Sequence, residues 1–542
     1  MKTNIIYSML LLVAALCSCN SDECFAPETS QPDSGAIELT VNAHNFVTDG
    51  APDTRATDNG KETTFENDDR VGVIILDGSS NIVYNNIPYK YNGSQWVFDS
   101  GNNESKSQCY YDNKAGSLTY IVYYPYSSVA DGAKSESDLK AQFPPKVIQQ
   151  SKEAYRASDL MVWTSLSATP LKTLTAELKH VYASVSLSPK LKYTLGDGNE
   201  ITYITSRLSD VNLTISDKVY SPYRAEDGSF RCILPVGFSD GNIRCFYTVD
   251  GKTYGGTFNI ASVAANTRYT STQQIDAGIY GLDKAKVGDF YCKNNSDEGY
   301  LIPGEVASLD DGINCLGIVY WVGSKAIDHD VLLKENHSEC THGLVVGLHE
   351  FRGKEDKGMH WSDSWESIRD NWINQDGNPY KGKVDTYKQN KLCGYSNTVA
   401  MTDYNKGSDY LAFPSNVKDN QGLLVLPCVA INEYAKNHTV PTASSGWYFP
   451  SIYELKYMCW GQENTGGVVG RDLLNRQIGK VSSKLDASPF SSSSYWSSTE
   501  GTYSGYGSDG RVAWDVYFGS GDTDNDYRKS NSSYLVRPSL AF

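Results

Sequence analysis

The residue most suited to covalent modification is a cysteine that directly follows a short apolar run. Residues 10–19 read Leu-Leu-Leu-Val-Ala-Ala-Leu-Cys-Ser-Cys, and Cys19 closes the run. Lys2 supplies a positive charge before it, and the apolar stretch 5–16 is shorter than a membrane span. Leucine and small residues before a cysteine suit a bacterial lipoprotein signal peptidase. We therefore expect residues 1–18 to be a signal peptide and Cys19 to carry a lipid that anchors the chain to a membrane; the alternative is an ordinary signal peptide with a chance cysteine.

A second residue suited to chemistry is Arg55, which lies in a run of turn-forming and polar residues. The stretch 48–60 contains nothing that could pack into a core. Such a loop is open to proteases, and a trypsin-like enzyme would cut between Arg55 and Ala56. The alternative is that Arg55 is a solvated loop residue and the lipid stays attached.

Between these two positions the sequence predicts one isolated strand. Residues 36–41 alternate, with Ile37, Leu39 and Val41 on one face, and polar linkers precede and follow them. A strand bracketed by flexible linkers can be displaced as a unit.

The composition favours β-rich domains with many turns. The 542 residues include 38 Tyr, 10 Trp and 46 Gly but only 6 Met, and their length suggests about three folded units. A formal net charge of −16 argues against nucleic-acid binding, because phosphates would be repelled. Further strands are predicted at 70–76, 95–98, 118–124, 178–187, 231–235 and 244–249.

The cysteines and histidines give no clear metal or cofactor site. Ten cysteines remain once Cys17 leaves with the signal peptide and Cys19 is lipidated, and no CxxC pair of zinc spacing occurs. Cys232 and Cys245 flank a turn-containing segment and could bridge neighbouring strands, although sequence cannot fix pairing. We expect no bound cofactor and no metal.

The first 280 residues resemble the fimbrillins, the exported lipoprotein subunits of Bacteroidetes pili. Besides the sequence around Cys19, the resemblance rests on five segments in order: 54–57, 65–73, 123–126, 158–161 and 178–183. It implies two tandem β-sandwich domains and an Arg-specific protease that removes the lipidated segment with its first strand. A strand of the next subunit would then fill the vacated groove, so the implied partners are other fimbrial subunits.

The last 260 residues resemble the bacterial C-type-lectin-like domains related to the sulfatase-modifying-factor fold. The residues that carry this resemblance are 446–455, 495–500, 513–518 and 535–538. Ser451 would cap a short helix with Leu455 and Met458 facing inward, and Trp496 and Trp514 would organise the core. The cysteine pair of the sulfatase-modifying enzymes has no counterpart here, so oxidase activity is not expected.

Loops at the far C-terminal end are the expected ligand contacts, because loops on a rigid scaffold usually carry binding residues. Asp522, Asp524 and Asp526 alternate as in an oxygen-rich calcium loop, but without the distal Gly and Glu of an EF-hand they are interpreted as a solvated acidic loop. The candidate contacts, from segments 500–510 and 519–527, are Tyr503, Tyr506, Asp522, Asp524, Asp526 and Tyr527.

Catalysis is the least favoured hypothesis. A polysaccharide hydrolase needs paired carboxylates across a cleft. Glu454 and Asp515 occupy the strongest motifs, but both have a structural use, at a helix start and on a strand. We therefore expect that the protein is not an enzyme.

The sequence thus predicts a mainly β protein: two fimbrillin-type β-sandwiches followed by a C-type-lectin-like α+β domain. The predicted divisions are 1–18, 19–60 (linker, first strand and processing loop), 61–189, 190–282 and 283–542. The leading hypothesis is a fimbrial tip adhesin, displayed at the outer membrane, that binds a glycan or a host or bacterial surface protein. The alternative is a monomeric, lipid-anchored outer-membrane protein that binds glycans or host matrix.

Overall fold

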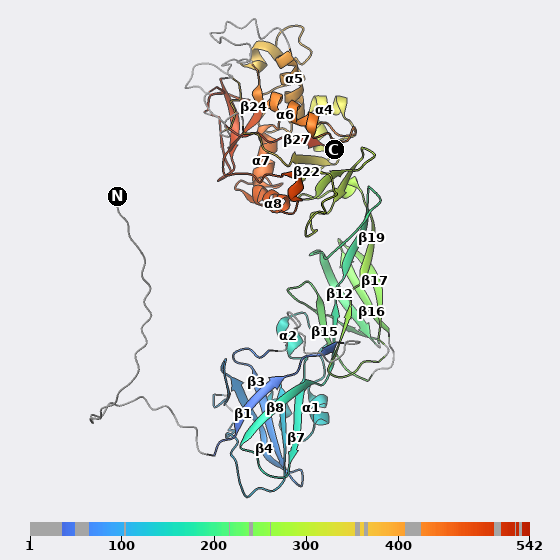
Figure 1. Cartoon of the computed structure of the whole chain (residues 1–542), viewed down its shortest axis with the longest axis vertical. Helices are drawn as coiled ribbons and strands as arrows, with labels where there is room; N and C mark the ends of the chain where they lie inside the picture. Colours follow the sequence, from blue (N-terminus) through green and yellow to red (C-terminus); the bar gives the residue numbers. More distant parts are fainter. Residues whose placement is uncertain are drawn as a thin grey trace, which may run out of the picture.

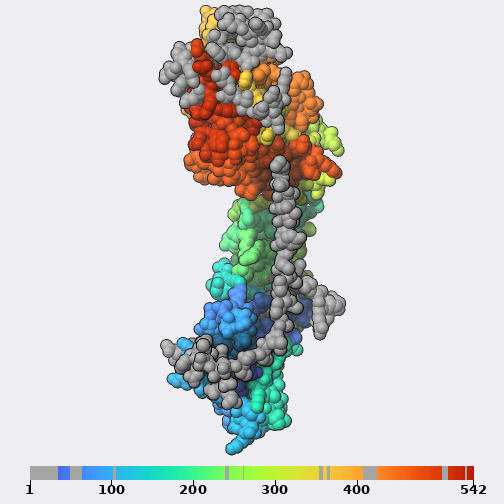
Figure 2. All heavy atoms as spheres, turned by 60° about the vertical axis from the view of Figure 1, so that its left-hand side comes forward, coloured from blue at the N-terminus to red at the C-terminus, as the bar shows by residue number. Residues whose placement is uncertain are grey.

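The computed structural model describes residues 35–48, 64–101, 105–215, 217–237, 242–260, 262–352, 358–362, 367–406, 424–502, 511–525, 527–530 and 534–542. This part of the chain is mainly β, as predicted. Three bodies follow one another along an elongated molecule (Figures 1 and 2). We call them the N-terminal unit (35–46 and 64–180), the middle unit (47–48 and 183–280) and the C-terminal unit (289–542).

The N-terminal unit is built on one seven-stranded sheet of order β1-β8-β7-β6-β3-β4-β5. Its strands are β1 (Glu38–Ala43), β3 (Arg70–Asp77), β4 (Ile82–Tyr91), β5 (Trp96–Phe98), β6 (Leu118–Tyr124), β7 (Met161–Ser167) and β8 (Thr173–His180); its helices are α1 (Glu136–Gln142) and α2 (Lys152–Arg156). Val73 and Ile75 of β3 face one hydrophobic cluster, and Ile74 and Leu76 face a second. Because β3 is buried on both faces, its sequence is a continuous apolar run rather than an alternation.

The predicted strand 178–187 is two strands in the structure. β8 ends at His180, and β9 (Ala183–Leu187) begins after Val181 and Tyr182 in a sheet of the middle unit. Both connecting residues are buried, so the apolar pattern runs through the break without marking it.

The middle unit contains three sheets, of orders β11-β10-β19, β13-β12-β16-β17 and β14-β15-β9-β18-β2. Besides β9, its strands are β2 (Val47–Thr48), β10 (Lys190–Leu195), β11 (Glu200–Tyr203), β12 (Leu208–Ile215), β13 (Lys218–Tyr220), β14 (Tyr223–Arg224), β15 (Phe230–Leu234), β16 (Asn242–Val249), β17 (Lys252–Asn259), β18 (Thr267–Ser271) and β19 (Gln274–Tyr280). The suggested bridge between Cys232 and Cys245 is wrong. Both are buried free thiols, and their strands β15 and β16 belong to different sheets.

In its described residues, the C-terminal unit combines a five-stranded sheet, β21-β20-β22-β23-β27, with a three-stranded sheet, β24-β25-β26, and six α-helices. The strands are β20 (Phe290–Lys293), β21 (Gly299–Ile302), β22 (Cys315–Val322), β23 (Gly343–Gly347), β24 (Ser494–Gly501), β25 (Val512–Tyr517), β26 (Asp522–Asp524) and β27 (Ser539–Ala541). The helices are α3 (Lys325–His329), α4 (Val331–Asn336), α5 (Gly394–Lys406), α6 (Leu426–Asn437), α7 (Ile452–Trp460) and α8 (Val469–Ile478).

The expected helix start at Ser451 is confirmed. The Ser451 side chain accepts from the backbone N–H of Glu454, and the Glu454 carboxylate accepts from the backbone N–H of Ser451, which completes a capping box. Leu455 and Met458 are fully buried on the inner face of α7. Trp496 is also fully buried, whereas Trp514 is only partly buried against the same core.

The middle and C-terminal units share polar contacts at their junction. The Tyr280 hydroxyl donates to Asp289 at 2.8 Å, and Arg207 pairs with Glu305 at 3.0 Å. Buried apolar side chains of the two units also form one continuous cluster. Within the described ranges, no helix has the length and apolar character needed to cross a bilayer.

Candidate functional site

The first strand lies at one edge of the N-terminal sheet. β1 pairs in parallel with β8, from Glu38 opposite Thr173 to Ala43 opposite Leu178. Alternation places Ile37, Leu39 and Val41 in the core, as predicted, with 4–8% of their surface exposed. Because β8 is the one strand neighbour of β1 among the described residues, the sheet keeps its other strands if this segment is removed, but it loses three core side chains.

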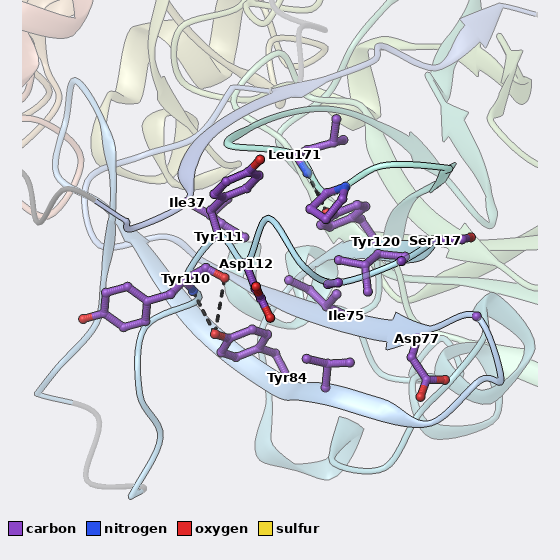
Figure 3. A pocket seen from close by; sticks show the side chains of 16 residues that line it. Ile37, Ile75, Asp77, Tyr84, Tyr110, Tyr111, Asp112, Ser117, Tyr120 and Leu171 are labelled. Carbon is purple, nitrogen blue, oxygen red and sulfur yellow. Dashed lines mark hydrogen bonds between the residues drawn. The ribbon is translucent and has the colours of Figure 1, made fainter.

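A cavity of about 390 Å³ lies at the N-terminal end of this strand (Figure 3). Ile37 lines it together with Tyr84, Tyr110, Tyr120 and Leu171. The Tyr84 hydroxyl accepts from the Tyr110 backbone N–H at 3.0 Å, and the Tyr120 hydroxyl accepts from the Leu171 N–H at 2.9 Å (Figure 3). The cavity at this end of the strand is therefore lined by aromatic and aliphatic side chains together with polar residues such as Asp77 and Asp112.

At its other end the segment is anchored by Phe46. This ring is 8% exposed and stacks on the His180 ring, with 3.5 Å between the centroids and 13° between the planes. The Arg268 guanidinium lies 5.2 Å from the Phe46 centroid, within cation–π range. His180 is held by Asp159, at 2.7 Å between Nδ1 and Oδ1. Phe46 thus fills a slot built from the ends of three distant segments.

Immediately after Phe46 the segment enters the middle unit. β2 pairs in parallel with β18, and the Val47 N–H donates to the Asn266 carbonyl at 2.8 Å. The segment 35–48, which we call the strap, therefore contributes a strand to a sheet in each of two units (Figure 1).

Residues of the fimbrillin-like segments support this region. Arg156 pairs with Glu66 at 2.8 Å and with Asp69 at 2.5 Å, which ties α2 to the start of β3. Asp159 and His180 come from two other such segments and meet beneath Phe46. Asp159 and His180 therefore have a structural role beneath the strap.

The predicted processing residues, Cys19, Arg55 and Ala56, lie outside the described residues, as do the contact candidates Tyr503, Tyr506 and Asp526. Of the remaining contact candidates, Tyr527 is 44% exposed. Asp522 and Asp524 lie on β26 rather than in a loop, and Asp524 is opposite Asp515 of β25. The lipid, cleavage and contact assignments stay predictions.

Glu454 and Asp515, the carboxylates considered for catalysis, are both buried. Besides the capping box, Glu454 accepts from the Tyr448 hydroxyl at 2.9 Å and the Gly394 N–H at 3.1 Å, and burial raises the pKa of Glu454 to about 7. Asp515 is 1% exposed, and burial, followed by the nearby Asp524 charge, raises the pKa of Asp515 to about 7. These contacts give Glu454 a structural role at the start of α7, as its position in the sequence predicts.

One group in the described ranges has metal-ligand geometry. Ligand atoms of His337, Glu339 and Cys340 lie within 4.8 Å of one another. However, the Cys340 Sγ donates to the Ala541 carbonyl at 3.3 Å, and burial raises the pKa of Cys340 to about 12. Both effects oppose the thiolate that a metal would require.

The strap's anchor could not be found from the sequence. Phe46, His180 and Arg268 are more than 80 residues apart in pairs, and only His180 falls in a segment that the sequence singles out. The one local feature that could have indicated an anchor is the aromatic residue Phe46, which follows the polar residues after the first strand.

Two sequence comparisons relate this chain to fimbrial proteins. Residues 54–289 match the family described as fimbrillin-like, which supports the fimbrillin assignment for that part of the chain. The proposed fimbrium tip subunit Fim1C of Bacteroides ovatus is 25% identical over 537 residues, covering 91% of each chain.

Solved structures are similar at lower identity. A fimbrial protein from Bacteroides ovatus is 20% identical, with a TM-score of 0.35, and covers 94% of this chain and 99% of its own. A proposed cell adhesion protein from Bacteroides uniformis is 15% identical, with a TM-score of 0.30, and covers 45% of this chain and 94% of its own.

Proposed function

We propose that this protein is a fimbrial subunit that occupies the tip of a surface fimbria and binds a ligand through its C-terminal unit. The fimbrillin-like match of residues 54–289 and the full-length similarity to a proposed tip subunit support the fimbrial part of this proposal. The pairing of β1 with β8 supports assembly by strand exchange, and the pairing of β27 with β23 supports a position at the tip.

Assembly proceeds by strand exchange. Cleavage between Arg55 and Ala56 removes the covalent link to the strap, which an incoming strand then displaces and which leaves with the lipid on Cys19. Its departure opens a groove along β8, and this groove lacks the side chains of Ile37, Leu39 and Val41. An exposed sheet edge next to an apolar groove is a template for a strand of another chain. A neighbouring fimbrial subunit supplies that strand.

The observation that carries the tip position is the placement of β27. Its residues pair with β23 from Ser539 opposite Val346 to Ala541 opposite Leu344, and Phe542 is 2% exposed. The Phe542 carbonyl also accepts from the His342 N–H at 2.9 Å. This strand is committed to its own unit, so the subunit accepts a strand at one end but has none to lend from β27. A subunit of this kind ends a polymer.

The C-terminal unit is the adhesive part, since its sequence resembles the bacterial C-type-lectin-like domains. The candidate contacts are Tyr503, Tyr506, Asp522, Asp524, Asp526 and Tyr527, and the ligand is a glycan or a surface protein of a host or another bacterium. The alternative function is a monomeric outer-membrane lipoprotein with the same ligand class; intact lipid on mature protein and the absence of a fimbrial partner would select it.

Immunogold labelling of native fimbriae with antibody against the C-terminal unit tests the tip position. Label confined to one end of each fimbria is expected, and label spaced along the shaft would overturn the proposal. N-terminal sequencing of the same fimbriae should begin at Ala56. If every surface molecule instead begins at Cys19, assembly by loss of the strap is wrong.

A further inference from the structure

The cavity of about 390 Å³ beside Ile37 reaches into the core that the strap completes (Figure 3). Ile75, Leu118 and Tyr120 line it and are at most 8% exposed. These three side chains belong to the same hydrophobic cluster as the inward-facing residues of β1. A cavity of about 150 Å³ already holds a benzene ring, so this one has room for an aromatic side chain.

Four polar groups of the lining are already hydrogen-bonded within the protein. The Tyr84 and Tyr120 hydroxyls each accept from a backbone N–H, at 3.0 and 2.9 Å. Asp77 and Asp112 accept from backbone N–H groups of their own turns, at 2.8–2.9 Å, and Asp112 is exposed. Apolar contact is therefore the main interaction that the interior of the cavity offers to a side chain.

The strap fills the two ends of its groove unequally. At one end Phe46 is 8% exposed and stacks on His180, with 3.5 Å between the ring centroids. At the other end Ile37 presents a short branched side chain to the cavity that it lines. A cavity beside a buried apolar side chain lowers stability, and a larger side chain can recover part of that loss. A strand with a larger residue in place of Ile37 would therefore fit this end better than the strap does.

We infer that this cavity receives a side chain larger than isoleucine, carried by the strand of a neighbouring fimbrial subunit that replaces the strap. That strand lies along β8 in the place of β1, and the residue that replaces Ile37 contacts the aromatic wall of the cavity. The additional burial favours the incoming strand over the strap and gives the exchange its direction. The inference rests on the proposed strand exchange and names the kind of residue that the partner must carry.

The alternative occupant is the segment 20–34 of this chain, which precedes the strap and lies outside the described residues. This segment is mostly polar, and Phe25 is its one large apolar side chain. Polar linkers of this composition bury too little apolar surface to pack stably, which favours the neighbouring subunit as the occupant.

The test uses the full chain, cut by trypsin after Arg55, and labelled peptides of residues 35–48 that compete with the bound strap. Fluorescence anisotropy measures the concentration at which each peptide displaces it. The Ile37→Phe peptide should act at a concentration about two- to tenfold lower than the native peptide, because it adds contacts between aromatic rings. The matched control is the Leu39→Phe peptide, which enlarges a core side chain outside the cavity lining and should bind more weakly through over-packing.

The peptide results separate failure of the inference from failure of the proposed function. Equal displacement by the native and Ile37→Phe peptides would overturn the inference alone. An equal gain with the Leu39→Phe peptide would also overturn it, since added apolar surface would then help at any position. If no peptide displaces the strap, strand exchange is rejected together with the inference.

A variant of the protein itself checks where the added ring lies. Ala115 lines the cavity and is partly buried, so Ala115→Leu narrows the space. The variant should remove the advantage of the Ile37→Phe peptide, while the native peptide displaces the strap as before and so shows that the variant is folded. An advantage that persists in Ala115→Leu would place the ring outside the cavity and refute the assignment.

A longer peptide decides between the two occupants. The peptide of residues 20–48 includes the segment before the strap and should displace the strap no better than the peptide of residues 35–48. Displacement at a lower concentration by the longer peptide would identify the segment 20–34 as the occupant of the cavity and would overturn the inference.

Discussion

Replacing Phe46 with alanine tests the idea that the strap is held mainly at its junction between two units. The side chain is 8% exposed, stacks on His180 and lies beneath Arg268, so truncation leaves a hole lined by polar groups. Phenylalanine-to-alanine changes in such sites cost about 3–5 kcal/mol. If the binding free energy of the strap weakens by even about 3 kcal/mol, the dissociation constant of the strap rises roughly a hundredfold.

The assay begins with limited trypsin digestion after Arg55, which leaves the strap bound only by non-covalent contacts. Gel filtration followed by mass spectrometry then measures how much of the strap stays with residues 56–542. The wild-type protein should retain it, and Phe46→Ala should release it. The control Phe143→Ala removes a partly buried ring that packs on Tyr123, 5.6 Å between centroids, outside the strap. It should lower the melting temperature without releasing the strap.

Two results would refute this reasoning. If Phe46→Ala retains the strap as tightly as the wild type, the Phe46 slot is not an anchor. If Phe143→Ala releases the strap equally, the loss reflects general destabilisation of the N-terminal unit.

Three further predictions concern processing, pH and domain independence. Cys19→Ala should abolish lipid labelling, and Arg55→Ala should abolish the first tryptic cut; normal labelling or an unchanged cut would show that the modified residue is a different one. Burial raises the pKa of Asp515 from its ordinary 3.8 to about 7, so the folded state binds a proton that the unfolded state releases, and the free energy of unfolding should fall as pH rises through this window, by up to about 4 kcal/mol. Asp515→Asn should flatten that fall in denaturant titrations at pH 5 and 8, and an unchanged slope would contradict it. The fragment 283–542 should fold alone with a melting temperature below that of the full chain, because it keeps Trp496 and its sheets but loses the partners of Asp289 and Glu305; an unfolded fragment by circular dichroism would contradict this.

Sequence patterns predicted the strands and helices whose formation depends on neighbouring residues in the chain. The alternation of Ile37, Leu39 and Val41 specified β1, and Ser451 with Glu454 three residues later specified the start of α7. The break between β8 and β9 was missed because buried residues continue through it.

The candidate sites depend on contacts between distant segments, and no periodicity encodes these. The Phe46 slot joins residues 46, 180 and 268. The suggested Cys232–Cys245 bridge failed for the same reason, since proximity along the chain does not show which sheet a strand joins.

The strap covers a sheet edge in each of two units. While the strap is in place, β1 covers the edge of β8 and β2 covers the edge of β18, so neither edge is open to stray pairing. Uncovered edges of this kind are sites of aggregation. In place, the strap therefore protects both sheets at once, and its departure would uncover the two edges together.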